Sequence, residues 1–364
     1  MSTELFDLTL NEEQRITREN MQRFIRDSLM PQAREADDAA RLEPTLVNAI
    51  HDFGLSLMPV PEALGGVGLP RSPLSNALAC EDLGSGDLSH ALAALQPMAV
   101  VNALMDFGNE DQQEQWLPGL AGEQWQGAAI ALVEPRATFE PGQLETTAST
   151  KGDTVEITGV KSLVPAGQSA QCFLVIAGTG EGPGAFMVPA DTAGVTVSPE
   201  PTMGLRSAGL CTLTLENVMV PASSRLPGFD LGRLLGLSWI GQCALAVGCC
   251  QAVLDYAIPY VKERKAFGEP IAWRQSVAFM VADIAIEIEG MRLMMLRAAS
   301  RAEQGLPFYQ EAYLAHLQCM EKAMIIGTNG IQLFGGAGFV RDYPLEMWYR
   351  NLRSLAVLNG SLMV

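Results

Sequence analysis

The sequence predicts an α+β protein of several domains, in the order N-terminal helical domain, middle antiparallel β domain and C-terminal helical domain. Apolar residues recur at spacings of three and four up to about residue 122, and again after Leu231, which is typical of amphipathic helices. Between about residues 127 and 227, short β-branched alternations are separated by turn residues, as in a small sheet or barrel. We therefore expect domains at residues 1–125, 126–230 and 231–364.

The individual elements follow from the same patterns. The helical pattern of the first block covers residues 11–29, 69–84 and 111–122, and a loop rich in proline and glycine between Pro59 and Gly68 interrupts it. In the middle block, we expect strands at residues 153–160, 172–178, 184–189, 194–200 and 212–221. Helices return after Leu231 and run to the last residue, with a glycine-rich joint at residues 327–339.

A long uncharged stretch opens the C-terminal block. The 21 residues between Arg233 and Asp255 would span about 30 Å as a helix, which is the thickness of a bilayer core. Ser238, Gln242 and Gln251 interrupt its apolar character, and a charged helical pattern follows it. We interpret the stretch as the buried central helix of a bundle and expect no membrane partner.

Charge and cysteine content narrow the classes of function. The chain has 41 acidic and 24 basic side chains, a formal charge of −17, which argues against nucleic-acid binding. The seven cysteines contain no C-x-x-C motif and the first fourteen residues contain no apolar signal region, so we expect a reduced, cytoplasmic protein. The three histidines are scattered, and no grouping has metal-ligand spacing, so we expect no metal site.

Several motifs, taken in order, resemble those of the acyl-CoA dehydrogenase family over essentially the whole chain. They are PEALGGVG at 61–68, WLP at 116–118, VEP at 133–135, MGLRS at 203–207, VKERKAFGEPI at 261–271 with Gln275, and IQLFGGAGFVRDYPLEMWYRNLR at 331–353. The resemblance implies the family's fold, whose last domain is a four-helix bundle. It also implies that FAD lies between the β domain and the C-terminal helices, and that a neighbouring subunit closes over its far end.

The family's chemistry requires a carboxylate that this chain lacks at the expected positions. Family members oxidise the Cα–Cβ bond of an acyl thioester: a glutamate removes the α-proton and the β-hydrogen leaves as hydride to the flavin. One family position for that glutamate corresponds to Asn359, directly before Gly360 and Ser361, and the other corresponds to Ser238. Neither side chain can take the proton, so we assign no catalytic residue to this chain.

The side of the β domain that faces the flavin in the family is altered as well. The family's Thr-Glu-Pro is Val133-Glu134-Pro135 here, and its Trp-Ile-Thr is Leu163-Val164-Pro165. Pro165 has neither a hydroxyl nor a backbone N–H, so two potential donors to the flavin are lost. An arginine that usually helps at the acyl-CoA site corresponds to Trp239.

The residues that the family donates to a neighbour's flavin are retained. Arg264 matches the arginine that reaches the FAD pyrophosphate, Phe267 the aromatic beside the adenine end and Gln275 a nearby polar contact. The glycine loop that lets the backbone approach the cofactor is matched by Gln332, Gly335 and Gly336. By themselves, these residues are also consistent with a solvated charge pair, a core aromatic and a tight helix joint.

Three hypotheses follow. In the first, the chain is the non-catalytic subunit of a heteromeric acyl-CoA dehydrogenase, such as the two-gene bacterial enzymes of steroid side-chain degradation, which carry half the usual number of flavins. A paralogous subunit then carries the glutamate and the acyl-CoA, and an electron-transfer flavoprotein accepts the electrons. In the second, the chain is a self-sufficient flavin dehydrogenase or oxidase with a displaced base, for which Glu140 and Asp230 are the acids to test. In the third, it is a non-enzymatic scaffold.

Overall fold

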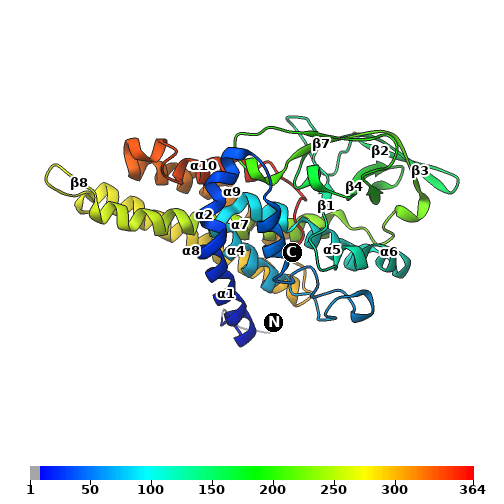
Figure 1. The fold of residues 1–364 in the computed structure, drawn as a ribbon, viewed down its shortest axis with the longest axis horizontal. Coiled ribbons are helices and arrows are strands. Elements are labelled where there is room, and N and C mark those ends of the chain that lie inside the picture. The colour runs from blue at the N-terminus through cyan, green and yellow to red at the C-terminus, as the bar shows by residue number, and fades with distance from the viewer. Residues whose placement is uncertain (1–8) are drawn as a thin grey trace. The chain divides into compact units, whose positions relative to one another are not determined.

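The computed structural model describes residues 9–364 and contains helices together with one large sheet (Figure 1). Residues 1–8, part of the stretch predicted to lack a signal segment, lie outside the described residues. The α-helices are α1 (Glu12–Phe24), α2 (Met30–Ala39), α3 (Pro44–His51), α4 (Pro73–Ala94), α5 (Gln96–Phe107), α6 (Glu110–Leu120), α7 (Leu231–Glu263), α8 (Gln275–Glu303), α9 (Tyr309–Phe334) and α10 (Leu345–Leu355). The strands are β1 (Ala128–Ala131), β2 (Thr147–Lys151), β3 (Thr154–Val164), β4 (Cys172–Thr179), β5 (Gly182–Pro189), β6 (Val195–Pro199), β7 (Cys211–Pro221), β8 (Lys265–Ala266) and β9 (Glu269–Pro270).

The chain divides into two compact units, each assembled from segments that are far apart in the sequence. The helical unit contains the described residues up to Glu35 together with Ser72–Leu88 and Trp239–Ala356. The sheet unit contains Ala36–Arg71, Ser89–Ser238 and Val357–Val364. The order of helices, sheet and helices along the chain confirms the predicted fold class. The predicted domain boundaries stay a prediction, because the compact units interleave segments from all three blocks.

Helix α7 forms the core of the helical unit. Its close contact with α4 depends on Gly248, because a Cβ there would lie 1.9 Å from the carbonyl oxygen of Glu81. Among the described residues, α7 is long and apolar enough to cross a membrane, and the bent pair α4–α5 also qualifies if counted as one span. The chain itself buries 94 % of the apolar window of α7. This burial agrees with the interpretation of residues 234–254 as a bundle core.

The large sheet has the strand order β1-β4-β2-β3-β7-β6, with β5 paired to β4. All five predicted strands are present, as β3 to β7. Most pairs are antiparallel as expected, but β4 runs parallel to β1 and, at one residue pair, to β2. The sheet is therefore mixed, because the β2–β3 hairpin lies between β1 and β4 in the sequence and the chain must cross over before β4 joins β1.

One ion pair is fully buried inside the sheet unit. The Nζ of Lys161, on β3, donates to Glu134 Oε1 at 2.8 Å and to the carbonyl oxygen of Leu132 at 3.1 Å. Glu134 also accepts the backbone N–H groups of Glu145 and Thr146. Burial lowers the pKa of Lys161 to about 8, and Glu134 acts in the opposite direction. The pair holds the segment after β1 against β3.

An aromatic cluster surrounds Trp239, in the third turn of α7, within the helical unit. The ring of Trp239 lies 5.2 Å from that of Tyr309 and 5.3 Å from that of Tyr313. The imidazole of His316 stacks on the same indole at 5.6 Å. Burial lowers the pKa of His316 from 6.5 to about 4, because the apolar surroundings disfavour the imidazolium.

We predict an acid-side loss of stability caused by His316. Between pH 6.5 and 4, the unfolded chain binds a proton at this histidine and the folded chain does not, so the free energy of unfolding falls as the pH falls through this window. The shift corresponds to about 3 kcal/mol when the titration is complete. Urea unfolding of the wild type and of His316→Gln at pH 7, 5 and 4 measures the difference. Equal pH dependence in the two proteins would contradict the assignment.

Candidate functional site

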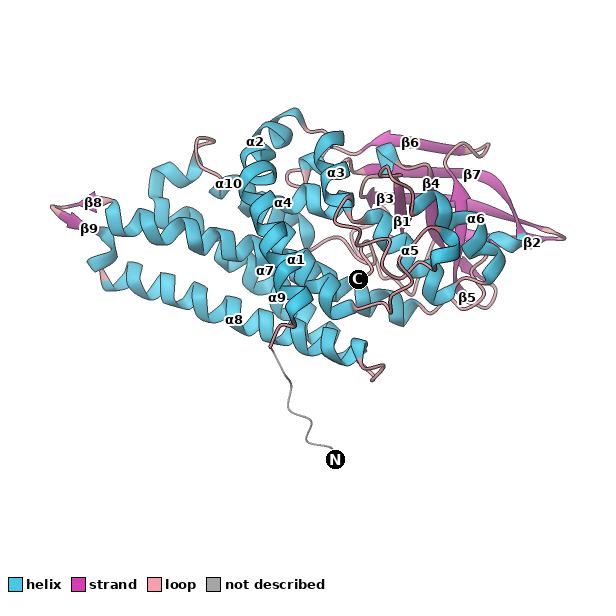
Figure 2. Ribbon diagram, turned by 60° about the horizontal axis from the view of Figure 1, so that its bottom comes forward, coloured by secondary structure: helices cyan, strands magenta, loops and turns pink. Residues whose placement is uncertain are grey.

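A groove of about 860 Å³ lies in the helical unit where α7, the β8–β9 hairpin, α8 and the end of α9 meet. Figure 2 shows the hairpin joining the ends of α7 and α8. Five of the six residues predicted to contact FAD line this hairpin groove: Arg264, Phe267, Gln332, Gly335 and Gly336. The sixth, Gln275, is the exposed first residue of α8 and lies between two lining residues, Arg274 and Ser276, without lining the groove itself. The fold thus gathers residues that are up to 72 positions apart, from 264 to 336.

The hairpin presents an aromatic ring to the outside of the chain. Phe267 is 97 % exposed and has a φ of +55°, and Gly268 follows with a φ of +88°. Positive φ at both central residues is what a tight two-residue hairpin turn requires, but it is rare for a bulky side chain. The guanidinium of Arg274 lies 5.9 Å from the ring. The exposure rules out the interpretation of Phe267 as a core aromatic.

The groove is positively charged although the protein is acidic. Its lining includes Arg264 and Arg274 and no carboxylate. Arg274 is paired with Glu269 at 2.9 Å, whereas the described residues offer no partner to the side chain of Arg264. An exposed guanidinium without a partner is suited to a phosphate, which it can bind through two hydrogen bonds.

Stacked aromatic rings form the floor of the groove. Phe334 lies 3.8 Å from Tyr260 in a nearly parallel stack, and Tyr343 meets Phe334 edge-on at 5.6 Å. After Phe334, the chain turns through Gly335, whose φ of +57° favours glycine. A Cβ on Gly336 would meet no atom of this chain within 4 Å. The glycine at 336 therefore leaves room for a group from outside the chain.

The two positions that correspond to the family's glutamate lie in the sheet unit. Ser238 is fully buried, and its Oγ accepts the backbone N–H of Leu362 at 3.3 Å. Asn359 is partly buried three residues before Leu362. The two acids considered as displaced bases have other roles: Asp230 accepts the backbone N–H of Arg233 at the start of α7, and Glu140 is exposed and accepts from Gln143.

The altered edge of the sheet offers few backbone donors. The N–H of Leu163 donates to Glu200 Oε2 at 2.7 Å, and the N–H of Ala166 donates to the carbonyl oxygen of Ala208 at 2.8 Å. Pro165 has no N–H, and a register shift between Lys161 and Val164 bends the strand. The N–H groups of Leu163 and Ala166 are thus hydrogen-bonded within their own unit, and Pro165 between them has none to offer.

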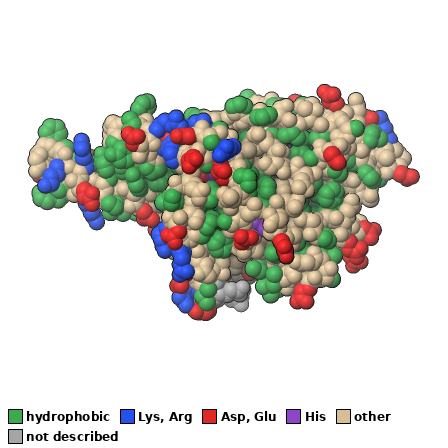
Figure 3. All heavy atoms as spheres, viewed as in Figure 1, with side chains coloured by type: hydrophobic (Ala, Val, Ile, Leu, Met, Phe, Trp, Pro, Cys, Tyr) green, Lys and Arg blue, Asp and Glu red, His purple; other side chains and the backbone are tan. Residues whose placement is uncertain are grey.

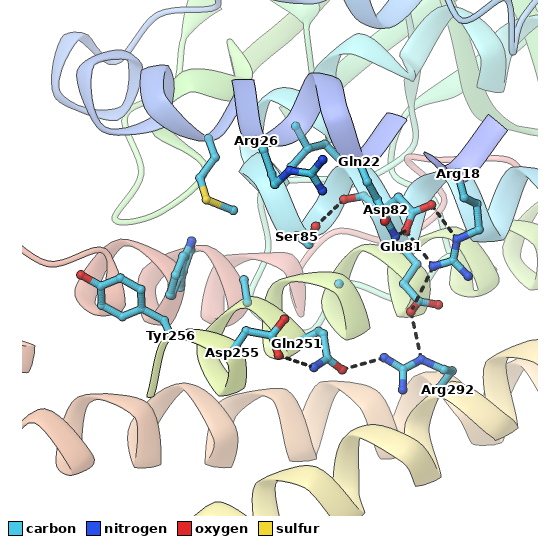
Figure 4. Close-up of a pocket in the computed structure, with 15 residues that line it drawn as sticks. Arg18, Gln22, Arg26, Glu81, Asp82, Ser85, Gln251, Asp255, Tyr256 and Arg292 are labelled. Carbon is cyan, nitrogen blue, oxygen red and sulfur yellow. Dashed lines mark hydrogen bonds and ion pairs between the residues drawn. The ribbon is translucent and has the colours of Figure 1, made fainter. Parts of the chain in front are cut away.

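A second cavity, of about 630 Å³, lies between α1, α4, α7 and α8 and holds a network of ion pairs (Figure 4). Arg18 binds both carboxylate oxygens of Asp82 at 2.7 Å. Arg292 donates to Glu81 and to Gln251, each at 2.9 Å. These contacts join α1 to α4 and α4 to α8, so we interpret the cavity as structural, and no predicted site residue lines it.

Sequence reasoning missed part of the groove and its surroundings. Tyr260, Arg274 and Phe334 line the groove, and the spacing by four of Tyr256 and Tyr260 on α7 and of Arg264 directly after it was a usable signal. Figure 3 shows hydrophobic side chains gathered over the region of α8. The exposed residues of α8 include Phe279, Ile286 and Leu293, which recur every seven positions and so share one face.

Comparisons with known proteins agree over nearly the whole chain. Family models described as the N-terminal, middle and C-terminal domains of acyl-CoA dehydrogenase match residues 11–124, 129–218 and 232–364. The chain is 33 % identical to "Probable acyl-CoA dehydrogenase YngJ" of Bacillus subtilis (strain 168), over 98 % of this chain and 96 % of that protein. Butyryl-CoA dehydrogenase from Megasphaera elsdenii superimposes with a TM-score of 0.89 at 28 % identity, covering 96 % and 95 % of the two chains. Glutaryl-CoA dehydrogenase from Mycobacterium smegmatis, in complex with FADH2, has a TM-score of 0.87 at 25 % identity, covering 95 % and 90 %.

Two glycines of the loop after α9 differ in what they do for the fold. Gly336→Ala should change the free energy of unfolding by less than about 0.5 kcal/mol, because its Cβ would enter open space. Gly338→Ala should cost about 1–3 kcal/mol, because its Cβ would lie 2.4 Å from the carbonyl oxygen of Ile331. Denaturant unfolding of both variants tests this contrast, and an equal loss at the two positions would show that Gly336 also serves the fold.

Proposed function

Because the chain belongs to the acyl-CoA dehydrogenase family, we propose that it is a subunit of a FAD-dependent acyl-CoA dehydrogenase. In this proposal, the hairpin groove of the chain binds part of the FAD of a paralogous partner. The partner would carry the catalytic glutamate and bind the acyl-CoA. We include CoA esters of steroid side chains among the proposed substrates. An electron-transfer flavoprotein would accept the electrons.

The groove fits the nucleotide half of FAD. FAD, when bound, supplies the hydride acceptor for oxidation of an acyl thioester. In this chain, Arg264 would bind the pyrophosphate oxygens, and Phe267 would pack against the adenine end. Gly335 and Gly336 leave the main chain open to close approach from outside.

One observation carries the proposal: the residues for a neighbour's cofactor are exposed and open, whereas this chain's own positions for catalysis hold no base. Phe267 and Arg264 contact little of their own chain. Asn359 and Ser238 stand where the family has its glutamate. The backbone N–H groups of Leu163 and Ala166 are already hydrogen-bonded within the chain. Random mutation would not retain the residues that contact a neighbour's flavin while it changes those at this chain's own catalytic positions.

The surface also favours a complex with another chain. Phe279, Ile286 and Leu293 on α8 are between 45 % and 67 % exposed. An apolar stripe of this kind is typical of a face that another chain covers. A hetero-oligomer, such as a heterotetramer, would cover it and place the hairpin against a partner.

The proposal predicts that flavin binding requires both chains. Purified alone, the protein should be colourless; co-expressed with a paralogue that has the glutamate, it should form a yellow, active complex with flavin on half of the chains. In that complex, Arg264→Ala should weaken FAD binding about ten- to a hundredfold through loss of charge-assisted hydrogen bonds. Lys265→Ala removes the neighbouring exposed cation, which does not line the groove, and should leave the flavin content unchanged.

Absorption spectra and acyl-CoA oxidation rates of the four preparations decide between the hypotheses. A homo-oligomer with one FAD per chain, whose flavin is reduced by acyl-CoA without a partner, would contradict the proposal and favour a self-sufficient enzyme. An active complex whose flavin content is unaffected by Arg264→Ala would show that the groove serves no cofactor.

A further inference from the structure

The segment Gly360–Val364 lies inside the sheet unit although it belongs to no helix or strand. Ser361 is 3 % exposed, and the next three residues, Leu362, Met363 and Val364, are fully buried. Figures 1 and 2 both place this end of the described chain beside α5. Buried irregular backbone is costly unless its polar groups find partners, so the partners of this segment are informative.

Side chains of the sheet unit, rather than a strand, supply those partners. Gln96 Nε2 donates to the carbonyl oxygen of Ser361 at 2.6 Å, and Asn102 Nδ2 donates to that of Met363 at 2.8 Å. Both amides are fully buried on α5, which is otherwise mostly apolar. The segment thus supplies acceptors for the amide N–H groups of two buried side chains, and Gln96 Nε2 also donates to the carbonyl oxygen of Leu92.

Arg71 completes the set of contacts. Its guanidinium donates to the carbonyl oxygen of Val364 and pairs with Asp106 at 2.6 Å. Burial lowers the pKa of Arg71, and Asp106 counteracts this effect. The carbonyl oxygens of Ser361, Met363 and Val364 are therefore all bound by side chains of the same unit.

Gly360 sets the backbone conformation at the start of the segment. Its φ is +63°, and a Cβ at this position would lie 2.3 Å from Leu132 Cδ2, just beyond β1. A larger residue at 360 could not keep this conformation without displacing the segment or the end of β1.

Both positions that could have held the family's base meet at this segment. Ser238 Oγ accepts the N–H of Leu362, and Asn359 directly precedes Gly360. A general base must lie within hydrogen-bond reach of the proton that it removes. If the chain had a base at either position, the acyl group would have to lie within its hydrogen-bond reach, and both positions adjoin Gly360–Val364.

We propose that Gly360–Val364 is an internal plug that fills this chain's own acyl site, and that displacing it exposes a channel for the linear acyl chain of a CoA thioester. The plug shares chemical features with such a ligand: its last three side chains are apolar and buried, and its carbonyl oxygens are bound by buried donors. The inference rests on the proposed function, and it adds that this chain cannot bind acyl-CoA while the plug is seated.

Thiol labelling tests whether the plug is seated. All seven native cysteines are buried, so an introduced cysteine reports its own surroundings. Met363→Cys should react with a maleimide at least about a hundredfold more slowly than Val357→Cys, whose position is 53 % exposed in the same tail. Octanoyl-CoA, but not coenzyme A, should accelerate labelling of Met363→Cys by competing for the channel. Equal rates for the two cysteines, or no response to octanoyl-CoA, would overturn the proposal.

Displacement of the plug gives the second test. Gly360→Leu, and a chain shortened after Asn359, should each bind octanoyl-CoA at least about tenfold more tightly than the wild type. Gly142→Leu is the matched control, because a Cβ at Gly142 meets no atom within 4 Å. Wild-type binding as tight as that of the displaced variants, or folded variants that bind no better, would refute the plug. Flavin on the partner is measured separately and is expected to be unaffected by Gly360→Leu, so the two proposals can fail independently.

Discussion

The burial of α7 is the constraint on which the helical unit depends. Its uncharged stretch of 21 residues must be covered on every side, and α4, α9 and the aromatic cluster around Trp239 provide that cover. Gly248 allows the backbone of α4 to approach closely enough to exclude water. Once α7 is fixed, the residues at its two ends are fixed as well.

The residues near the two ends of α7 have different surroundings. At one end, Tyr260 and Arg264 enter a groove that is open, positively charged and lined by glycines. At the other end, Ser238 is buried and bonded to the chain's own Leu362. In our two proposals, the same helix supplies a binding surface for a ligand from outside and one wall of a site that the chain fills itself. A subunit that assists a partner's cofactor needs the first and not the second.

Periodicity was sufficient for much of the fold. The strands β3 to β7 were predictable because apolar and polar residues alternate along the half-buried ones and β4 is a continuous apolar run between turns. The short strands β1 and β2 were missed: β1 has only four residues, and β2 reads TASTK, which has no apolar alternation. Their parallel pairings with β4 depend on the path of the chain between strands, which local patterns do not record.

By itself, the sequence determined which chemistry the chain retains: Arg264, Phe267 and the glycines are present, and a carboxylate is absent at Asn359 and Ser238. Residue identity is sufficient for such conclusions because a side chain either can or cannot accept a proton or bind a phosphate. Only the tertiary structure showed that Phe267 is almost fully exposed and that Gly360–Val364 is bound by Gln96, Asn102 and Arg71. These contacts join residues more than 250 positions apart, so no local sequence pattern predicts them. The burial of a residue likewise depends on all the residues that pack around it.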